Sequence, residues 1–335
     1  MIDFRSDTVT QPCDAMRQTM NNAPLGDDVY GDDPSVNALE KYAAQKHGFA
    51  SALFCSSGTQ ANLLALMAHC ERGDEYICGQ RAHNYKFEGG GAAVLGSIQP
   101  QPIENEADGS LCLNKIKAAI KADDFHFAKT KLVSLENTIG GQVLSLEYLS
   151  KAREFVDAHK LALHLDGARV YNAAAKLGVD ITRITNYFDS VSVCLSKGLG
   201  APVGSVLLGS EVLIAKARRW RKVLGGGMRQ AGMLAAAGQY ALEHNIKRLS
   251  DDHDNAVYLA TQLNTLNGFS VELNSVETNI VYVDVDDNID LAAISHRLAA
   301  KNILFSPGKP LRLVTHLGIT KKSVNAFIEA LAAEI

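Results

Sequence analysis

The chain has 335 residues, of which 47% are hydrophobic and 21% charged, and its 33 basic and 37 acidic side chains leave a net charge of -4. This composition is typical of a soluble globular protein, and the slight acidic excess does not favour a nucleic-acid partner. The length exceeds that of one ordinary hydrophobic core, so we expect one large domain and one smaller domain.

The N-terminus and the cysteines favour a cytoplasmic protein. Residues 1–7 (MIDFRSD) contain early acids and lack the basic stretch and apolar run of a secretory signal. No segment approaches the ~18 consecutive apolar residues that a membrane span requires. The six cysteines form no C-x-x-C pair and lie mostly among apolar residues, so we expect reduced thiols in the core.

Three regions follow one another along the chain. Residues 1–25 show weak periodicity and are predicted to form an N-terminal arm that covers another surface. A loop rich in Gly and Asp opens the second region at residues 26–34 (GDDVYGDDP). Residues 26–245 are predicted to form the large domain, and residues 246–335 the small C-terminal domain.

Within the second region, short apolar runs alternate with helical patterns. Helices are expected at 59–70 and 146–159, the first with apolar residues at helical spacing. This alternation predicts an α/β domain with a mostly parallel sheet covered by helices. The runs predicted as strands are 51–55, 76–78, 131–135, 161–165 and 190–195.

The third region has a different pattern, in the order helix, strand, strand, helix, strand, strand, helix. Its clearest predicted strands are 271–273, 280–284 and 311–314. Residues 246–335 are therefore expected to form an α+β domain.

Residues 55–62 (CSSGTQAN) join an apolar strand to an apolar-periodic helix. Small residues at this point let the backbone N–H groups of a helix N-terminus approach an anion, and Ser or Thr hydroxyls add donors. The motif therefore predicts a phosphate cradle. Because Ser and Thr are also ordinary N-caps, the motif by itself admits a purely structural interpretation.

Two further motifs place an acid and an amine at strand ends. Asp166, in residues 164–169 (HLDGAR), follows a buried-looking strand at the edge where α/β sheets bind ligands, although it could also cap the next helix. Lys197, in residues 192–200 (SVCLSKGLG), closes another apolar run, where a lysine is costly unless it has a task. A surface lysine just beyond the strand is the alternative.

Together the three motifs predict a site for pyridoxal 5'-phosphate (PLP). This cofactor needs an anchor for its phosphate, an acid that keeps its ring nitrogen protonated, and a lysine amine that condenses with its aldehyde. Asp166 and Lys197 supply the acid and the amine.

Over nearly its whole length the chain resembles the low-specificity L-threonine aldolases, PLP-dependent enzymes of fold type I, the aspartate-aminotransferase fold. The resemblance implies a PLP-dependent transferase-like large domain. It also implies retro-aldol cleavage of L-threonine, L-allo-threonine and related β-hydroxy-α-amino acids to glycine and an aldehyde. The motifs that carry it are RSDTVT at 5–10, DDVYGDDP at 27–34, SLENT at 134–138, HLDGAR at 164–169, LSKG at 195–198 and GGGMRQ at 225–230.

The resemblance also implies roles for residues that would bind the cofactor. Lys197 corresponds to the Schiff-base lysine, Asp166 to the partner of the ring nitrogen, and Gly58 with Thr59 to the phosphate cradle. His83 matches the histidine that stacks on the cofactor ring, although a lone histidine in a turn is more often structural.

The substrate carboxylate requires fixed cationic donors, which guanidinium groups supply bidentately. In the family pattern Arg312 and Arg169 fit this role together with Ser6, and Arg169 is also assigned to the cofactor. Arg312 alternates with apolar residues, so a solvated strand face is its alternative interpretation. A base must take the proton of the β-hydroxyl group, and the candidates are His83, His126 or a water molecule held by one of them.

The basic stretch at 218–222 (RRWRK) would ordinarily be interpreted as a solvated helix face. The resemblance instead assigns Lys222 and Arg229 to the cofactor region of a neighbouring subunit, and Tyr30 to its substrate region. It therefore implies a homotetramer with sites at the subunit interfaces.

The chain departs from the family pattern at Ile139-Gly140-Gly141, where many relatives carry a histidine after the preceding threonine. This departure concerns substrate preference more than the reaction. No His, Cys and Asp residues have a metal-ligand spacing in the sequence. Other fold-type-I enzymes, such as a β-eliminating lyase or an aminotransferase, remain rivals because the same three motifs hold PLP in all of them. A PLP-binding protein without turnover is disfavoured by the complete set of groups.

Overall fold

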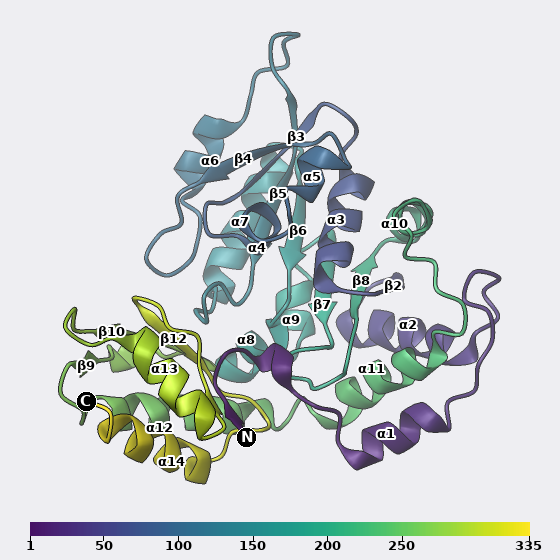
Figure 1. The fold of residues 1–335 in the computed structure, drawn as a ribbon. Helices are drawn as coiled ribbons and strands as arrows, with labels where there is room; N and C mark the ends of the chain where they lie inside the picture. The colour runs from purple at the N-terminus through teal and green to yellow at the C-terminus, as the bar shows by residue number, and fades with distance from the viewer.

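In the computed structural model, which describes residues 1–335, a seven-stranded sheet forms the centre of the large domain (Figure 1). The strand order is β2-β8-β7-β6-β5-β3-β4, and only β8 runs antiparallel to its neighbours. The strands are β2 (Ser51–Cys55), β3 (Asp74–Gly79), β4 (Gln99–Ile103), β5 (Lys129–Glu136), β6 (Ala162–Asp166), β7 (Ser190–Cys194) and β8 (Ser205–Gly209).

The five predicted strands of this sheet are confirmed, but β4 and β8 were missed. β4 has the sequence QPQPI and forms the edge of the sheet, where prolines are tolerated because one side of the strand donates no ladder hydrogen bonds. β8 is fully buried between β2 and β7, and its five residues follow a glycine-containing turn rather than a helix. The α/β class is nevertheless the one that the alternating pattern predicts.

Helices cover the sheet, and α3 is the one that matters most for the site. α3 is buried on nearly all sides, in agreement with its small hydrophobic asymmetry, and it packs against the sheet and α10. The helices of this domain are α2 (Pro34–His47), α3 (Gly58–His69), α4 (His83–Lys86), α5 (Gly91–Val94), α6 (Leu113–Ala119), α7 (Leu146–Ala158), α8 (Val170–Leu177), α9 (Thr182–Thr185), α10 (Glu211–Val223) and α11 (Gly232–His244). No helix of the chain combines the length and apolarity needed to cross a bilayer.

The segment 249–332 has the element order that the sequence predicts, and its buried apolar residues form a core of their own with Phe4, so we name it the small domain. It contains α12 (Leu249–Leu263), β9 (Phe269–Ser270), β10 (Ile280–Val285), α13 (Leu291–Ala300), β11 (Ile303–Leu304), β12 (Leu311–Val314) and α14 (Lys321–Ala332). The predicted strand at 271–273 is wrong, because the strand ends at Ser270 and a 3-10 turn, η2 (Leu273–Ser275), follows. The Glu272 side chain accepts from the N–H of Asn274 and so favours the turn.

The two ends of the N-terminal arm pack against different domains. Its strand β1 (Ile2–Asp3) pairs in parallel with β11, and Phe4 is fully buried in the core of the small domain. The 3-10 turn η1 (Asp7–Val9) follows, and α1 (Asp14–Asn21) packs against α11 of the large domain. Figure 1 shows this path, from the N-terminus beside the small domain to α1 on the other side of the molecule. The arm therefore ties the two domains of its own chain together.

We expect Phe4→Ala to destabilise the small domain by about 3–5 kcal/mol, because it removes a fully buried ring and leaves a cavity. The ring of Phe4 lies 4.8 Å from that of Phe327. Urea denaturation followed by circular dichroism measures the loss. Leu273→Ala, at an exposed position of the same domain, should change stability by less than about 0.5 kcal/mol. Equal effects of the two substitutions would contradict the structural role of the arm.

Candidate active site

The carboxyl ends of neighbouring parallel strands bring the predicted site residues together. In the register of the sheet Glu136 lies beside Asp166, and Asp166 lies beside Ser192. Lys197 follows the end of β7 by three residues, and the N-terminus of α3 lies at the end of β2. This is the edge at which α/β sheets bind ligands.

Asp166 is buried and is held in place by a network that starts on α3. Its Oδ2 accepts from Nδ2 of Asn62 at 2.7 Å, and its Oδ1 accepts from the N–H of Ala168 at 3.1 Å. Oδ1 of Asn62 in turn accepts from the hydroxyl of Ser192 at 2.6 Å, which fixes the amide. Asp166 is thus an oriented acceptor for an N–H group, and Asn62 is a positioning residue that sequence reasoning missed.

Lys197 lies in a loop whose backbone is held from two directions. The hydroxyl of Thr10 donates to the carbonyl of Lys197 at 3.1 Å, and Arg248 donates to the carbonyl of Gly198 at 3.3 Å. The amine of Lys197 forms no hydrogen bond or ion pair within the chain, although its charge helps to lower the pKa of Asp7. A lysine with a fixed backbone and an unpaired amine is available for chemistry.

The N-terminus of α3 has the features expected of an anion cradle. Ser57 is its N-cap and accepts from the N–H of Gln60 at 3.1 Å, so the structural interpretation of the motif holds for this serine. The N–H groups of Gly58 and Thr59 have no acceptor within the chain, as is usual in a first helical turn. A Cβ on Gly58 would lie only 2.7 Å from Sγ of Cys194, so only glycine lets the helix end approach the sheet this closely.

His83 begins α4 and forms a pair with an acid that was not predicted. Its Nδ1 lies 2.8 Å from Oε1 of the buried Glu88, and this hydrogen bond raises the pKa of His83. Asn62 donates to the same Glu88 oxygen at 2.9 Å. Because Nδ1 is engaged with Glu88, Nε2 is the nitrogen of His83 left to accept a proton on the cavity side.

Glu136 is the second carboxyl group at the end of the sheet. It accepts from the N–H of His83 at 2.7 Å and is surrounded by protein. Burial, followed by the adjacent charge of Asp166, raises the pKa of Glu136 to about 8. Two neighbouring carboxylates repel each other when both are charged, so this environment favours the protonated form of Glu136.

A cavity of about 570 Å³ opens beside His83 and Glu136, between the two domains, and Asp166 and Lys197 are not among the residues that line it. His83, Glu136 and Arg169 line it from the large domain, and Tyr282 and Arg312 line it from the small domain. Arg312 therefore faces a cavity and not bulk solvent.

The N-terminal arm contacts both arginines of this cavity. Arg169 forms a bidentate ion pair with Asp7, with Nε to Oδ2 at 2.8 Å and NH2 to Oδ1 at 2.6 Å. Arg312 donates to the backbone carbonyl of Arg5 at 3.2 Å. Ser6 lies between these two contacts as the N-cap of η1, and its hydroxyl lies 3.4 Å from Oδ1 of Asp7.

Four predicted residues lie outside this cluster. His126 is exposed and pairs with Asp124 just before β5. It therefore lies at the amino end of this strand, roughly 25 Å of strand away from Glu136 at the carboxyl end. Within one chain, His126 is therefore not part of the site. The remaining three, Tyr30, Lys222 and Arg229, are at least partly exposed, and Arg229 pairs with Asp27.

The solvated-face interpretation of residues 218–222 is wrong for Arg221. This side chain is buried, forms an ion pair with Asp28 at 2.7 Å and donates to the carbonyl of Phe54. Arg218 similarly pairs with Glu40. Part of the basic stretch thus stabilises its own chain.

His83, Glu88 and Asp166 also bring three possible metal ligands within 4.8 Å of one another. No spacing in the sequence indicates this, because the three residues come from α4, the loop after it and β6. The Glu88 oxygen already bonds to both His83 and Asn62, and Asp166 accepts from Asn62. The donors are thus used to orient one another, as expected around an organic cofactor.

We expect Glu136→Gln to change how stability depends on pH in the protein prepared without cofactor. The folded-state pKa is raised to about 8 from its ordinary value of 4.5, so the folded chain holds a proton that the unfolded chain has released between these values. The contribution of Glu136 is full below pH 4.5 and is lost as the pH rises through 8. Thermal unfolding from pH 5 to 9 should therefore show a fall for the wild type that Glu136→Gln lacks.

Glu147→Gln, on the exposed face of α7, is the matched control and should follow the wild-type curve. Parallel curves for the wild type and Glu136→Gln would show that Glu136 is ionised at neutral pH, against this interpretation.

The chain is similar in sequence to known proteins over most of its length. The model of the beta-eliminating lyase family matches residues 3–287. The low specificity L-threonine aldolase of Escherichia coli (strain K12) is 55% identical over 324 residues, covering 97% of this chain and 96% of that protein. The probable low-specificity L-threonine aldolase 2 of Arabidopsis thaliana is 48% identical over 293 residues, covering 86% of this chain and 82% of that protein.

Among solved structures, the threonine aldolase of Leishmania major superposes with a TM-score of 0.82 at 21% identity and covers 99% of both chains. A putative aromatic amino acid beta-eliminating lyase/threonine aldolase of Exiguobacterium gives a TM-score of 0.80 at 21% identity, with 98% of both chains covered. At this identity the likeness concerns the fold, and it confirms the fold that the resemblance implies. The curated relatives carry the assignment further: the chain belongs to the low-specificity L-threonine aldolases of the beta-eliminating lyase family.

Proposed function

We propose that this chain uses PLP to cleave L-threonine, L-allo-threonine and related β-hydroxy-α-amino acids into glycine and an aldehyde. The observation that supports the proposal is that Asp166, Lys197 and His83 lie at or just after the carboxyl ends of β6, β7 and β3, while Arg169 and Arg312 face the cavity that His83 also lines. Membership of the aldolase family supports the choice of reaction.

The residues present fit PLP in each of its parts. The first turn of α3 would bind the phosphate through the N–H groups of Gly58 and Thr59, which have no acceptor in the chain. Asp166 would accept the hydrogen bond of the protonated ring nitrogen, and Lys197 would hold the aldehyde carbon through its unpaired amine. When bound, PLP supplies an electron sink for the pair of electrons released from the Cα–Cβ bond.

The arginines of the cavity would bind and orient the substrate. A guanidinium group recognises a carboxylate through two parallel N–H donors, and both Arg169 and Arg312 face the cavity. Ser6, between the arm contacts of these arginines, would add a hydroxyl donor. Holding the carboxylate at this end sets which bond of the substrate lies across the plane of the cofactor.

The β-hydroxyl proton would be taken by His83 or by a water molecule that it holds. Nδ1 of His83 is engaged with Glu88, so Nε2 is the accepting nitrogen, and Glu88 stabilises the positive charge that develops. We prefer His83 to His126 because His126 lies at the amino end of β5 in the same chain.

We also propose a cytoplasmic homotetramer in which Lys222, Arg229 and Tyr30 approach the site of a neighbouring subunit. The exposure of Tyr30, at 77%, supports a role outside its own chain. The six cysteines are all unpaired, in keeping with a reducing compartment. Sedimentation equilibrium tests the assembly, since a monomer at micromolar concentration would contradict it.

Product analysis distinguishes the aldolase from rivals that share the same cofactor site. The purified protein is incubated with PLP and each of the four threonine isomers, and glycine, acetaldehyde and keto acids are quantified. From L-threonine and from L-allo-threonine alike, we expect one molecule of acetaldehyde for each molecule of glycine. A keto acid as the main product would refute the aldolase reaction and favour elimination or transamination.

We expect Lys197→Ala to lose covalent attachment of the cofactor but to keep its fold. Lys197 lies after β7, and its amine forms no hydrogen bond or ion pair that the fold would lose. Borohydride reduction followed by mass spectrometry should find the cofactor on Lys197 in the wild type and nowhere in the variant. Turnover should fall by at least about 100-fold. A variant with normal turnover would rule out Lys197 as the cofactor lysine.

We expect Glu88→Gln to lower kcat by about 10- to 100-fold, because it removes the acid that orients His83. Glu88 raises the pKa of His83, so its removal should move the acidic limb of the kcat/KM profile to lower pH. Glu243→Gln, at the exposed His244–Glu243 pair on α11, is the control and should leave the profile unchanged. An unshifted acidic limb in Glu88→Gln would exclude His83 as the titrating base.

A further inference from the structure

Asp7 is a fully buried acid that the reaction described above does not use. It begins η1 in the N-terminal arm, and its side chain has no exposure to solvent. Although burial opposes ionisation, the charge of Arg169 lowers the pKa of Asp7, so the carboxyl group remains charged. A buried charge of this kind is costly unless its partners need it.

The geometry of the Asp7–Arg169 pair leaves one side of the guanidinium unoccupied. Asp7 engages Nε and NH2 of Arg169, at 2.8 Å and 2.6 Å. NH1 makes no hydrogen bond within the chain, and Arg169 lines the cavity. A guanidinium presents five N–H donors in a rigid plane, so fixing the Nε–NH2 edge also fixes the direction of the NH1–NH2 edge.

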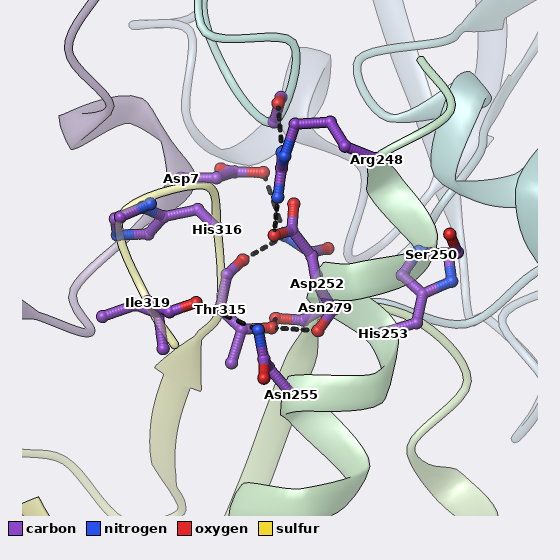
Figure 2. Close-up of polar contacts among 12 residues, drawn as sticks. Asp7, Arg248, Ser250, Asp252, His253, Asn255, Asn279, Thr315, His316 and Ile319 are labelled. Atoms are coloured by element: carbon purple, nitrogen blue, oxygen red, sulfur yellow. Dashed lines mark hydrogen bonds and ion pairs between the residues drawn. The ribbon is translucent and has the colours of Figure 1, made fainter. Parts of the chain in front are cut away.

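Asp7 itself is fixed by the small domain. Nδ2 of Asn279 donates to Oδ2 of Asp7 at 3.2 Å and to the carbonyl of Thr315 at 3.0 Å. The hydroxyl of Thr315 donates to the carbonyl of Asp252 at 2.6 Å, and Asp252 pairs with Arg248. Figure 2 shows Asp252, Asn279 and Thr315 below Asp7, with Arg248 above Asp252.

The same cluster also contacts the loop that carries Lys197, the proposed cofactor lysine. Arg248, which pairs with Asp252, donates to the carbonyl of Gly198, the residue after Lys197. Thr10, from the same arm as Asp7, donates to the carbonyl of Lys197. The arm and the small domain therefore hold the Lys197 loop and the Arg169 guanidinium in a fixed relation.

We propose that Asp7 is a positioning residue that orients Arg169 for the carboxylate of the amino-acid ligand, and that it thereby determines selectivity for a free carboxylate at this end of the site. The inference rests on the proposed function for the identity of that ligand. It differs from a purely structural role, in which Asp7 would only join the domains and would affect all ligands equally.

The test compares glycine with glycinamide, which differ in the group that Arg169 would bind. Binding to the PLP-loaded protein is followed by the change in cofactor absorbance, without turnover. We expect Asp7→Asn to raise the Kd of glycine by about 10-fold or more, as for the loss of a charge-assisted contact, and that of glycinamide by less than about 3-fold. The KM for L-allo-threonine should rise more than kcat falls.

Two variants serve as controls for folding and burial. Glu75→Gln removes another buried acid with a cationic partner, Lys121 at 2.7 Å, at the opposite edge of the sheet. This variant should unfold at a lower temperature than the wild type. The ratio of the glycinamide Kd to the glycine Kd should stay unchanged. Asn279→Ala retains the Asp7–Arg169 ion pair and removes the hydrogen bonds that Asn279 donates to Asp7 and to the carbonyl of Thr315, so it should reduce the ratio of the glycinamide Kd to the glycine Kd by about 2- to 3-fold. It replaces Asp7→Asn as the test if that variant does not fold.

The outcomes separate the two proposals. Equal weakening of glycine and glycinamide in Asp7→Asn, or in Asn279→Ala where Asp7→Asn does not fold, would overturn the positioning role and leave Asp7 as a domain clamp. A wild type that does not distinguish the two ligands would overturn it as well. If the wild type distinguishes them, Asp7→Asn abolishes the difference and no threonine isomer is cleaved, the positioning role stands and the aldolase proposal fails.

Discussion

The ion pair between Asp7 and Arg169 is the contact at which the N-terminal arm, the large domain and the small domain meet. Arg169 follows β6, Asp7 precedes α1, and Asn279 joins them from the start of β10. Because a buried carboxylate and a buried guanidinium each need the other, neither domain can move away without exposing an uncompensated charge.

A second constraint acts where β5 and β6 end side by side. Glu136 and Asp166 lie in register, and burial with the neighbouring charge raises the pKa of Glu136. The N–H donors are distributed accordingly: Asp166 receives two and Glu136 receives one. Asn62 links this pair to Glu88 and hence to His83. The side-chain amide of Asn62 on α3 thus donates hydrogen bonds both to Asp166 and to Glu88, the acid paired with His83.

The two domains contribute different groups around the site, and this explains how one cofactor site can serve several reactions. The large domain supplies the groups proposed to hold PLP, whereas Tyr282 and Arg312 line the cavity from the small-domain strands. The bond that breaks depends on how the substrate is held against the cofactor. Small changes on β10, on β12 or in the arm can therefore alter selectivity without disturbing the cofactor site.

The sequence by itself determined the α/β class, the order of the small-domain elements and the motifs around Asp166 and Lys197, because periodicity and strand-end chemistry are local properties. It did not reveal β8, which is antiparallel to both neighbours and pairs non-locally with β2, or the contacts of Asp7, Asn62 and Glu88. These contacts join segments far apart in the chain, such as Asp7 with Arg169. Only the tertiary structure decided them. It also separated His126 from Glu136 within one chain, because these residues lie near opposite ends of β5.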